Sequence, residues 1–259
     1  MYILILIFFG LLAAYFFFRR KTSLNSNTLE KTVDNNGLLL QEHVAYFQNL
    51  NDKDKKRFMI LFQEFLKDVN IEGVGTEITE LDKVLIGSSA IIPIFGFPDW
   101  KYQNLTNIIL YPDTFDNEFQ FEGENRNIMG MVGAGFMNGQ MLLSRNALMK
   151  GFSSSAGKEN AGIHEFVHLL DRTGGETDGV PENLMTHSYS LPWLKMIHQE
   201  MHRIQSGKSD INPYGLTNEA EFFAVSAEYF FEKPKELQHK HPELYAQLCV
   251  VFSQHPAGN

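Results

Sequence analysis

The sequence predicts an α+β domain that is mainly helical, with a small sheet and one apolar helix before it. Three observations predict this: apolar residues recur at helical spacing, short apolar runs flank an Asn-Gly pair, and the first residues carry no charge. The 259 residues are enough for one large domain, and a content of 44% hydrophobic residues, with 22 Phe, excludes a disordered chain. We divide the chain into an N-terminal helix over residues 1–21, a polar linker over 22–40 and a folded domain over 41–259.

The first segment is expected to be a membrane anchor. Residues 2–18 carry no charge, and the next three residues, Arg19, Arg20 and Lys21, are all basic. As a helix the run is about 26 Å long, close to a bilayer core of about 30 Å, and a cleavable signal peptide would have its basic residues before the run. Basic residues flank membrane helices on the cytoplasmic side, so we expect a single-pass anchor in the cell inner membrane and a cytoplasmic domain. The alternatives are a buried core helix and the opposite orientation, with the domain outside the cell.

The folded domain is expected to begin with an amphipathic helix. Asn51 is a favoured capping residue, and apolar side chains follow it at three- and four-residue spacing: Phe58, Leu61, Phe62, Phe65 and Leu66. A stripe of this kind packs against a core, so we assign it a structural role.

A short strand and a hairpin are expected in the middle of the chain. Ile108–Tyr111 is apolar and is followed by Pro112, while residues 128–136 and 140–144 flank Asn138-Gly139, a pair that suits a type I′ turn. The first strand of this hairpin contains three glycines, Gly130, Gly133 and Gly135. Glycines in a strand indicate either a bulge or a close approach by another chain, such as a peptide that adds to a sheet edge.

The charge balance and the single cysteine exclude several kinds of site. The chain has 22 Lys and Arg against 31 Asp and Glu, a net charge of −9, which repels phosphate backbones, so we expect no direct nucleic-acid partner. A single cysteine, Cys249, forms neither an internal disulfide nor a cysteine-ligated zinc cluster.

Residues 163–171 read IHEFVHLLD and contain the motif HExxH in a segment that we expect to be helical. Residues four apart project from one face of a helix, so the imidazoles of His164 and His168 can bind one metal ion. Glu165 lies about 100° around the helix from His164 and can reach a water beside the ion, as a general base must. The alternative is two hydrogen-bonded histidines without an ion, but burying these polar side chains among apolar ones is costly.

A catalytic zinc site needs a third protein ligand and one open position. Residue 174 is glycine, which excludes a third histidine at the short spacing of some zinc peptidases. Two carboxylates are candidates. Asp171 follows on the same helical face but is better suited to orient a ligand histidine. Glu221 stands in the first turn of a helix expected to start at Thr217 or Asn218, where Asn218 and Glu221 also fit a simple capping box.

Other polar residues have weaker signals. Tyr214, in the turn Asn212-Pro213-Tyr214-Gly215, is a phenol that near a metal can donate a hydrogen bond to a developing oxyanion. His187 is a further possible ligand. His198 and His202 are four apart, but no glutamate follows His198 directly, so we favour a solvated helix face for this pair.

From about Leu50 to Phe252 the chain resembles the Mlc titration factor A family of zinc peptidases, and its active-site segments resemble the catalytic domain of anthrax lethal factor. The segments that carry the resemblance are residues 50–75, IILYPDTF at 108–115, HEFVHLLD at 164–171, DGVP at 178–181 and residues 214–231, which end in AEFFAVSAEYFF.

The resemblance implies a zincin-like metallopeptidase domain that holds one Zn²⁺. The ligands would be His164, His168 and Glu221, with Glu165 as the general base and Tyr214 as the oxyanion stabiliser. It also implies peptidase or aminopeptidase activity and the capture of a cytoplasmic transcriptional repressor of sugar uptake. The apolar N-terminal segment departs from the soluble members of the family.

Two functions of different classes follow. The first is a membrane-anchored zinc metallopeptidase that hydrolyses peptide or protein substrates in the cytoplasm. The second is a regulatory binding protein that captures a transcriptional repressor and keeps zinc mainly for structure.

Overall fold

The computed structural model describes residues 35–258, except residues 134–136, 156, 173–176, 182–183 and 185–186. The chain divides into two compact units, Met1–Leu39 and Leu40–Asn259. Of the first unit, residues 35–39 are described and are helical. The predicted anchor over residues 1–21 lies outside the described residues. Among the helices that are described, none combines the length and the apolar character needed to cross a bilayer.

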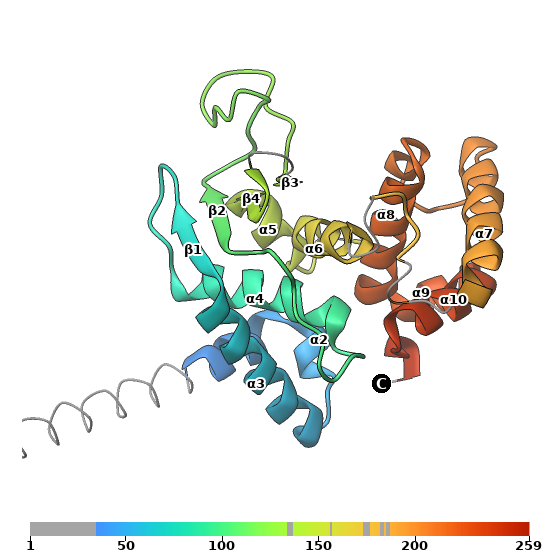
Figure 1. The fold of residues 1–259 in the computed structure, drawn as a ribbon, viewed down its shortest axis with the longest axis horizontal. Helices are drawn as coiled ribbons and strands as arrows, with labels where there is room; N and C mark the ends of the chain where they lie inside the picture. Colours follow the sequence, from blue (N-terminus) through green and yellow to red (C-terminus); the bar gives the residue numbers. More distant parts are fainter. Residues whose placement is uncertain are drawn as a thin grey trace, which may run out of the picture. The chain divides into compact units, whose positions relative to one another are not determined.

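The second unit is mainly helical and contains one small mixed sheet, which confirms the predicted fold class at that level (Figure 1). Its helices and strands, in chain order, are α2 (Ala45–Gln48), α3 (Asp52–Asp68), β1 (Asn70–Gly73), α4 (Glu80–Ile94), β2 (Asn107–Tyr111), β3 (Gly130–Val132), β4 (Gln140–Ser144), α5 (Arg145–Gly151), α6 (Ala161–Asp171), α7 (His187–Gln205), the 3₁₀ helix η3 (Pro213–Leu216), α8 (Glu219–Glu232), α9 (Pro234–Lys240), α10 (Pro242–Phe252) and η4 (Pro256–Gly258).

The helix expected after Leu50 is α3. The side chain of Asn51 accepts a hydrogen bond from the backbone of Asp54, which caps the helix as predicted. Three residues of the predicted stripe, Phe58, Phe62 and Phe65, are buried, and Leu61 and Leu66 lie at the edge of the core. The stripe therefore has the structural role that its spacing indicates.

The sheet has the strand order β1-β2-β4-β3, and β3 is at an edge. The first three strands in this order are parallel, while β3 runs antiparallel to β4, with Gly130 opposite Leu143. The expected strand is β2, and β3 and β4 form the expected antiparallel pair, but the predicted type I′ turn is wrong. Gly139 has a φ of +88°, whereas Asn138 does not have the positive φ that such a turn needs, and β3 already ends at Val132. Strand β3 is also shorter than the predicted run over residues 128–136, because Ile128 pairs with Phe115 in an isolated bridge instead of with β4.

Small residues allow the helix α6 to lie close to the buried helix α4. A Cβ atom at Gly162 would lie 2.1 Å from Oγ of Ser89, a residue of α4 whose hydroxyl donates to the backbone carbonyl of Leu85. Figure 1 shows α6 between the sheet side of the unit and α8. Gly162 is therefore needed for this close contact, because a larger residue at 162 would force α4 and α6 apart.

The segment DGVP, which follows α6 in the chain, contacts both the end of α6 and the start of α8. The backbone N–H of Gly179 donates to Oδ2 of Asp171 at the end of α6, at 2.8 Å, and the indole of Trp193 donates to the Gly179 carbonyl at 2.6 Å. Gly179 has a φ of +79°, and a Cβ atom there would lie 2.4 Å from the carbonyl oxygen of Glu219 in the first turn of α8. Glycine at this position therefore lets the segment lie directly against the start of α8.

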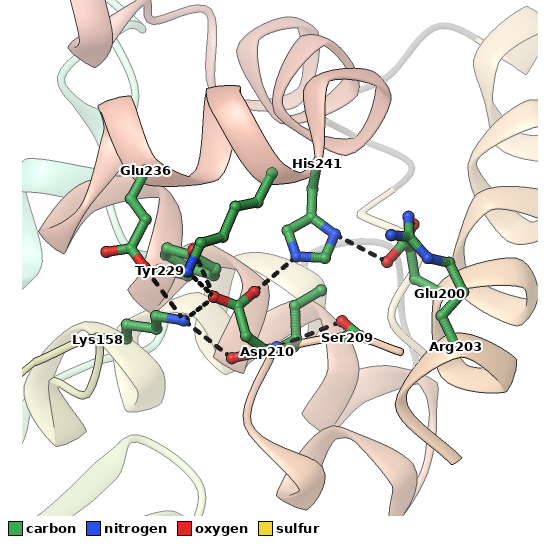
Figure 2. Close-up of polar contacts among 10 residues, drawn as sticks. Lys158, Glu200, Arg203, Ser209, Asp210, Tyr229, Glu236 and His241 are labelled. Carbon is green, nitrogen blue, oxygen red and sulfur yellow. Dashed lines mark hydrogen bonds and ion pairs between the residues drawn. The ribbon is translucent and has the colours of Figure 1, made fainter. Parts of the chain in front are cut away.

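An ionic cluster with a buried centre and a partly exposed rim joins the C-terminal helices (Figure 2). The imidazole of His241, which is 3% exposed, lies between two carboxylates: Nδ1 is 3.1 Å from Glu200 and Nε2 is 2.8 Å from Asp210. Asp210 also accepts hydrogen bonds from Lys158, Lys240 and the hydroxyl of Tyr229. The hydrogen bond to Glu200, together with that to Asp210, raises the pKa of His241 by more than burial lowers it.

The charge on His241 is expected to stabilise the fold at low and neutral pH. Because its folded-state pKa is raised, this stabilisation is complete below about pH 6.5, the ordinary histidine pKa, and is lost as the pH rises through the raised value. We expect His241→Gln to lower the free energy of unfolding by about 2 kcal/mol at pH 6 and by less at pH 9. Urea unfolding at both pH values measures this.

His239→Gln is the matched control, because His239 is exposed on the neighbouring helix α9. It should change the free energy of unfolding little at either pH. An effect of His241→Gln that is the same at pH 6 and pH 9 would contradict the assignment of a charged imidazole.

Candidate metal centre

The HExxH motif lies on α6, as predicted. The buried side chain of Asn160 caps this helix by accepting a hydrogen bond from the backbone of Ile163 at 3.1 Å. The two histidines project from one face, with the Nε2 atoms of His164 and His168 3.1 Å apart. The local geometry therefore follows directly from the four-residue spacing.

Glu221 brings a carboxylate to these imidazoles from α8. Its Oε2 atom lies 2.9 Å from Nε2 of His164 and 3.4 Å from Nε2 of His168. Its backbone N–H meanwhile donates to the capping side chain of Asn218 at 2.9 Å. The two interpretations of Glu221 are thus compatible: its backbone takes part in the helix cap, and its side chain faces the histidines.

The three donor atoms form a triangle that matches a tetrahedral metal ion. Its edges are 2.9, 3.1 and 3.4 Å, and ligands at about 2.0–2.1 Å from a tetrahedral zinc lie about 3.3 Å from one another. Among the described histidine, cysteine and acidic side chains, these three are the group that could hold an ion. Two nitrogens and one oxygen also suit zinc and other first-row ions.

Glu228 orients one of the histidines, and the sequence analysis did not identify it. Its Oε1 atom lies 2.8 Å from Nδ1 of His164, and its Oε2 atom accepts a hydrogen bond from the backbone of Asn160. A carboxylate on Nδ1 fixes the proton there and leaves Nε2 free to bind a metal ion. The signal was present in the sequence, since Glu228 follows Glu221 by seven residues, two turns along the same helix face.

The charges of these residues are strongly coupled. Burial alone would lower the pKa of His164, but hydrogen bonds to Glu221 and Glu228 outweigh it and raise the pKa well above the usual value. Burial alone would raise the pKa of Glu221, but its contacts with His164 and His168 lower the pKa to about 2. The carboxylates thus hold positive charge at this point, and a bound cation would replace a proton.

Glu165 lies against β3. A Cβ atom at Gly130 would lie 2.5 Å from Cγ and 2.7 Å from Oε1 of Glu165, so the glycine leaves space for this side chain. Burial raises the pKa of Glu165, while the neighbouring imidazoles act in the opposite sense. The glycine at 130 thus makes room for a side chain of the protein itself, whereas the predicted approach of another backbone stays a prediction.

Tyr214 lies at the open side of the site. Its ring centroid is 6.1 Å from that of His164, and the side chain is 53% exposed. The turn that carries it packs closely on α8, since a Cβ atom at Gly215 would lie 2.9 Å from Cγ2 of Val225. Tyr214 and Glu165 both line a cleft of about 390 Å³ that also includes His164, Gly130 and Met129.

Asp171 lies near His168 but does not hydrogen-bond to it. Its Oδ2 atom accepts a hydrogen bond from the backbone of Gly179, and the imidazole of His168 is among the groups that lower the pKa of this carboxyl, which burial raises to about 6. Within the described part of the chain, Oδ1 of Asp171 and Nδ1 of His168 are both buried and have no hydrogen-bond partner. Orientation of His168 by Asp171 therefore stays a prediction, whereas Glu228 contacts His164 directly.

Two further candidate histidines, His198 and His202, do not join the site. Both are exposed on α7, where His198 Nε2 lies 3.3 Å from the carboxylate of Glu219. The solvated helix face predicted for this pair is confirmed. The side chain of His187 lies outside the described residues.

Comparison with known proteins agrees with the metal centre. The chain matches a sequence family described as glucose-regulated metallo-peptidase M90 over residues 16–253. An uncharacterized protein of Synechocystis sp. is 26% identical over 232 residues, which are 85% of this chain and 84% of that protein. Mlc titration factor A of Cronobacter sakazakii is 26% identical over 227 residues, 82% of this chain and 84% of that protein. Mlc titration factor A of Yersinia enterocolitica is 26% identical over 226 residues, 80% of this chain and 81% of that protein.

The contact between Glu228 and His164 predicts an effect on metal affinity. We expect Glu228→Gln to weaken zinc binding about 10- to 100-fold, because the amide does not hold the Nδ1 proton of His164 as a carboxylate does. Competition with a chelating dye measures the affinity, and circular dichroism checks the fold.

Glu219→Gln, at a half-buried position on the same helix whose carboxylate lies near His198 and not near the metal centre, is the matched control and should leave the affinity unchanged. Equal zinc affinities of Glu228→Gln and the unchanged protein would remove the orienting role.

Proposed function

Because the chain belongs to the glucose-regulated metallo-peptidase M90 family, we propose that it is a zinc-dependent peptidase. The observation that carries this proposal is the convergence of His164, His168 and Glu221 at a cleft that His164 itself lines together with Glu165. A metal ion needed only for structure would be enclosed by four protein ligands, whereas three ligands at a cleft leave one position for water or substrate.

The residues that would hold Zn²⁺ are His164, His168 and Glu221, and Glu228 would keep His164 in the binding tautomer. When bound, the ion supplies Lewis acidity, which makes a water acidic near neutral pH and polarises a peptide carbonyl. Side chains of the protein would carry out the proton transfer and stabilise the negative charge that develops on the substrate.

Glu165 would move the proton. Its carboxylate would accept a proton from the attacking water and then deliver it to the nitrogen of the leaving amine. A buried carboxyl with a raised pKa suits both steps, because it binds the proton more readily than an exposed one and can still release it. The hydroxyl of Tyr214 would donate a hydrogen bond to the substrate oxygen as negative charge develops on it.

The edge strand β3 would position the substrate. It pairs with β4 on one side only, and Gly130 and Met129 line the cleft. An extended peptide can add to an edge strand through its backbone, which holds the scissile bond largely independently of the side chains. We include removal of N-terminal residues among the proposed activities, in line with the aminopeptidase activity that the resemblance implies.

We further propose that residues 1–21 anchor the protein in the cell inner membrane with the peptidase domain in the cytoplasm. The support is the uncharged run over residues 2–18 and the three basic residues after it. Substrates would then be peptides or proteins close to the inner surface of that membrane.

A second candidate function is capture of a regulatory protein. The observation in its favour is the name of two relatives, Mlc titration factor A, which describes titration of a partner and not hydrolysis. In this case a transcriptional repressor would be the partner, and zinc would stabilise the binding domain.

Substitution of the general base separates these two functions. We expect the full-length Glu165→Gln protein to bind zinc as tightly as the unchanged protein, because Glu165 is not one of the ligands, and to hydrolyse unblocked chromogenic peptides at least about 100-fold more slowly. His168→Ala should lose both properties. Metal analysis and a chelator-sensitive peptide assay provide the two measurements.

Glu219→Gln again provides a control that should retain zinc and activity. Undiminished hydrolysis by zinc-loaded Glu165→Gln would refute the assigned base, and no hydrolysis of any peptide by the zinc-loaded unchanged protein would favour the binding function.

The anchor predicts the cellular distribution of the chain. We expect the full-length protein to stay in the membrane fraction after a high-salt wash, because an apolar helix is not held by ionic contacts, and to resist protease added to intact cells. A variant without residues 1–21 should appear in the soluble fraction. Cleavage of the domain by external protease would reverse the proposed orientation.

A further inference from the structure

A groove of about 660 Å³ lies between the first half of α3 and the loop that follows α4. Four cationic side chains line it beside two large apolar ones: Lys53, Lys56, Arg57, Lys101, Ile60 and Trp100. The catalytic cleft has a different lining, and none of the residues proposed for the reaction faces this groove. The groove therefore needs an explanation of its own.

Two of the cations form the walls of the groove and two are available to a ligand. Arg57 donates to the carbonyl of Phe95 at 2.7 Å and lies over its ring, and Lys101 pairs with Asp68 at 3.0 Å. Lys53 and Lys56 are exposed and form no ion pair or hydrogen bond with any part of the chain that the structure describes. Their charges are thus open to a partner in a groove whose walls are already fixed.

The position of these cations is unfavourable for the helix itself. Lys53, Lys56 and Arg57 lie in the first two turns of α3, where the helix dipole disfavours positive charge. Ile60 follows on the same face and is 60% exposed. Arg57 is compensated by its contacts with Phe95, but Lys53 and Lys56 have no such contact within the described residues, and local features that oppose stability are expected where a surface serves binding.

The composition of the groove fits an acidic polypeptide that carries an apolar side chain. Lys53 and Lys56 would meet its carboxylates, and Ile60 and Trp100 would contact the apolar group. A nucleic acid fits less well, because the whole chain has a net charge of −9 and the groove lining includes Glu64 and Asp99. A flat lipid surface would leave the concave part of the groove unfilled.

Trp100 connects this groove with the region of the catalytic cleft. It also lines a second cavity of about 380 Å³, together with Val132 and Gly133 at one end of β3. Gly130, at the other end of β3, lines the catalytic cleft. A polypeptide extended along this edge strand would therefore meet the groove beyond the residues that are cleaved.

We propose that the groove is a docking site for an acidic segment of the polypeptide substrate, remote from the scissile bond. This inference rests on the proposed peptidase function. The groove sets which proteins are held, and the cleft performs the reaction. Binding at the groove is expected to weaken as salt increases, because the charges on both sides are exposed.

The binding test uses the full-length Glu165→Gln protein, which does not consume the probe. The probe is a fluorescein-labelled peptide of Glu and Asp around one Phe, followed by anisotropy. We expect the double variant Lys53→Ala/Lys56→Ala to weaken binding about fivefold or more, and Trp100→Ala to weaken it as well. Lys55→Ala is the matched control, because Lys55 lies on the same helix but contacts Gln41 and the ring of Phe47, outside the groove.

The kinetic test uses the unchanged catalytic residues. Lys53→Ala/Lys56→Ala should raise KM for a substrate that carries an acidic segment and leave kcat, and the hydrolysis of a substrate without that segment, unchanged. Equal binding of the acidic peptide by the double variant and the Lys55→Ala control would overturn the proposal. So would equal binding of a Gln/Asn version of the peptide, or charge-dependent binding to anionic vesicles without binding to the peptide. Intact peptide binding without any hydrolysis by the zinc-loaded unchanged protein would instead reject the peptidase function.

Discussion

Three donor atoms from two helices lie within 2.9–3.4 Å of one another, and this contact places a strict constraint on the domain. Two imidazole nitrogens and a carboxylate oxygen repel one another at such distances unless a cation or shared protons lie among them. Helices α6 and α8 must therefore be held at a fixed separation. Gly162 holds α6 against α4, and Gly179 holds the connecting segment against the start of α8. Residues far from the chemistry thus determine whether the donor atoms meet.

A network of buried hydrogen bonds extends the same constraint from the three donor atoms to the start of α6. Glu228 joins His164 to the backbone of Asn160, and the side chain of Asn160 caps α6 and donates to Glu232 at 2.8 Å. The cap of the motif helix and the orientation of its first histidine therefore depend on the same residues. Burial raises the pKa of Glu232 to about 7, which shows how strongly this region disfavours further negative charge. A cation at His164 would relieve that cost for the carboxylates around it.

Local patterns predicted the elements that local physics controls. The cap at Asn51 and the helical spacing of His164 and His168 depend on residues within a few positions of one another, and each is found where it was expected. The predictions that fail concern the strand and the turn before β4. The strand is shorter than its apolar run, because Ile128 pairs with Phe115, and Asn138-Gly139 does not form the type I′ turn, because only Gly139 of the pair has a positive φ.

The sequence by itself determined the two histidines and the glutamate of the motif, since four-residue spacing on a helix brings side chains together without help from the rest of the chain. It also identified Glu221 as a candidate ligand but left Asp171 beside it. Only the tertiary structure chose between them and revealed Glu228, because the packing of α8 on α6 brings together residues 57 and 64 positions apart in the chain. The seven-residue spacing places Glu221 and Glu228 on one helix face, but it does not show which helix that face meets, because this is decided when two separately formed helices bury their apolar faces against one core.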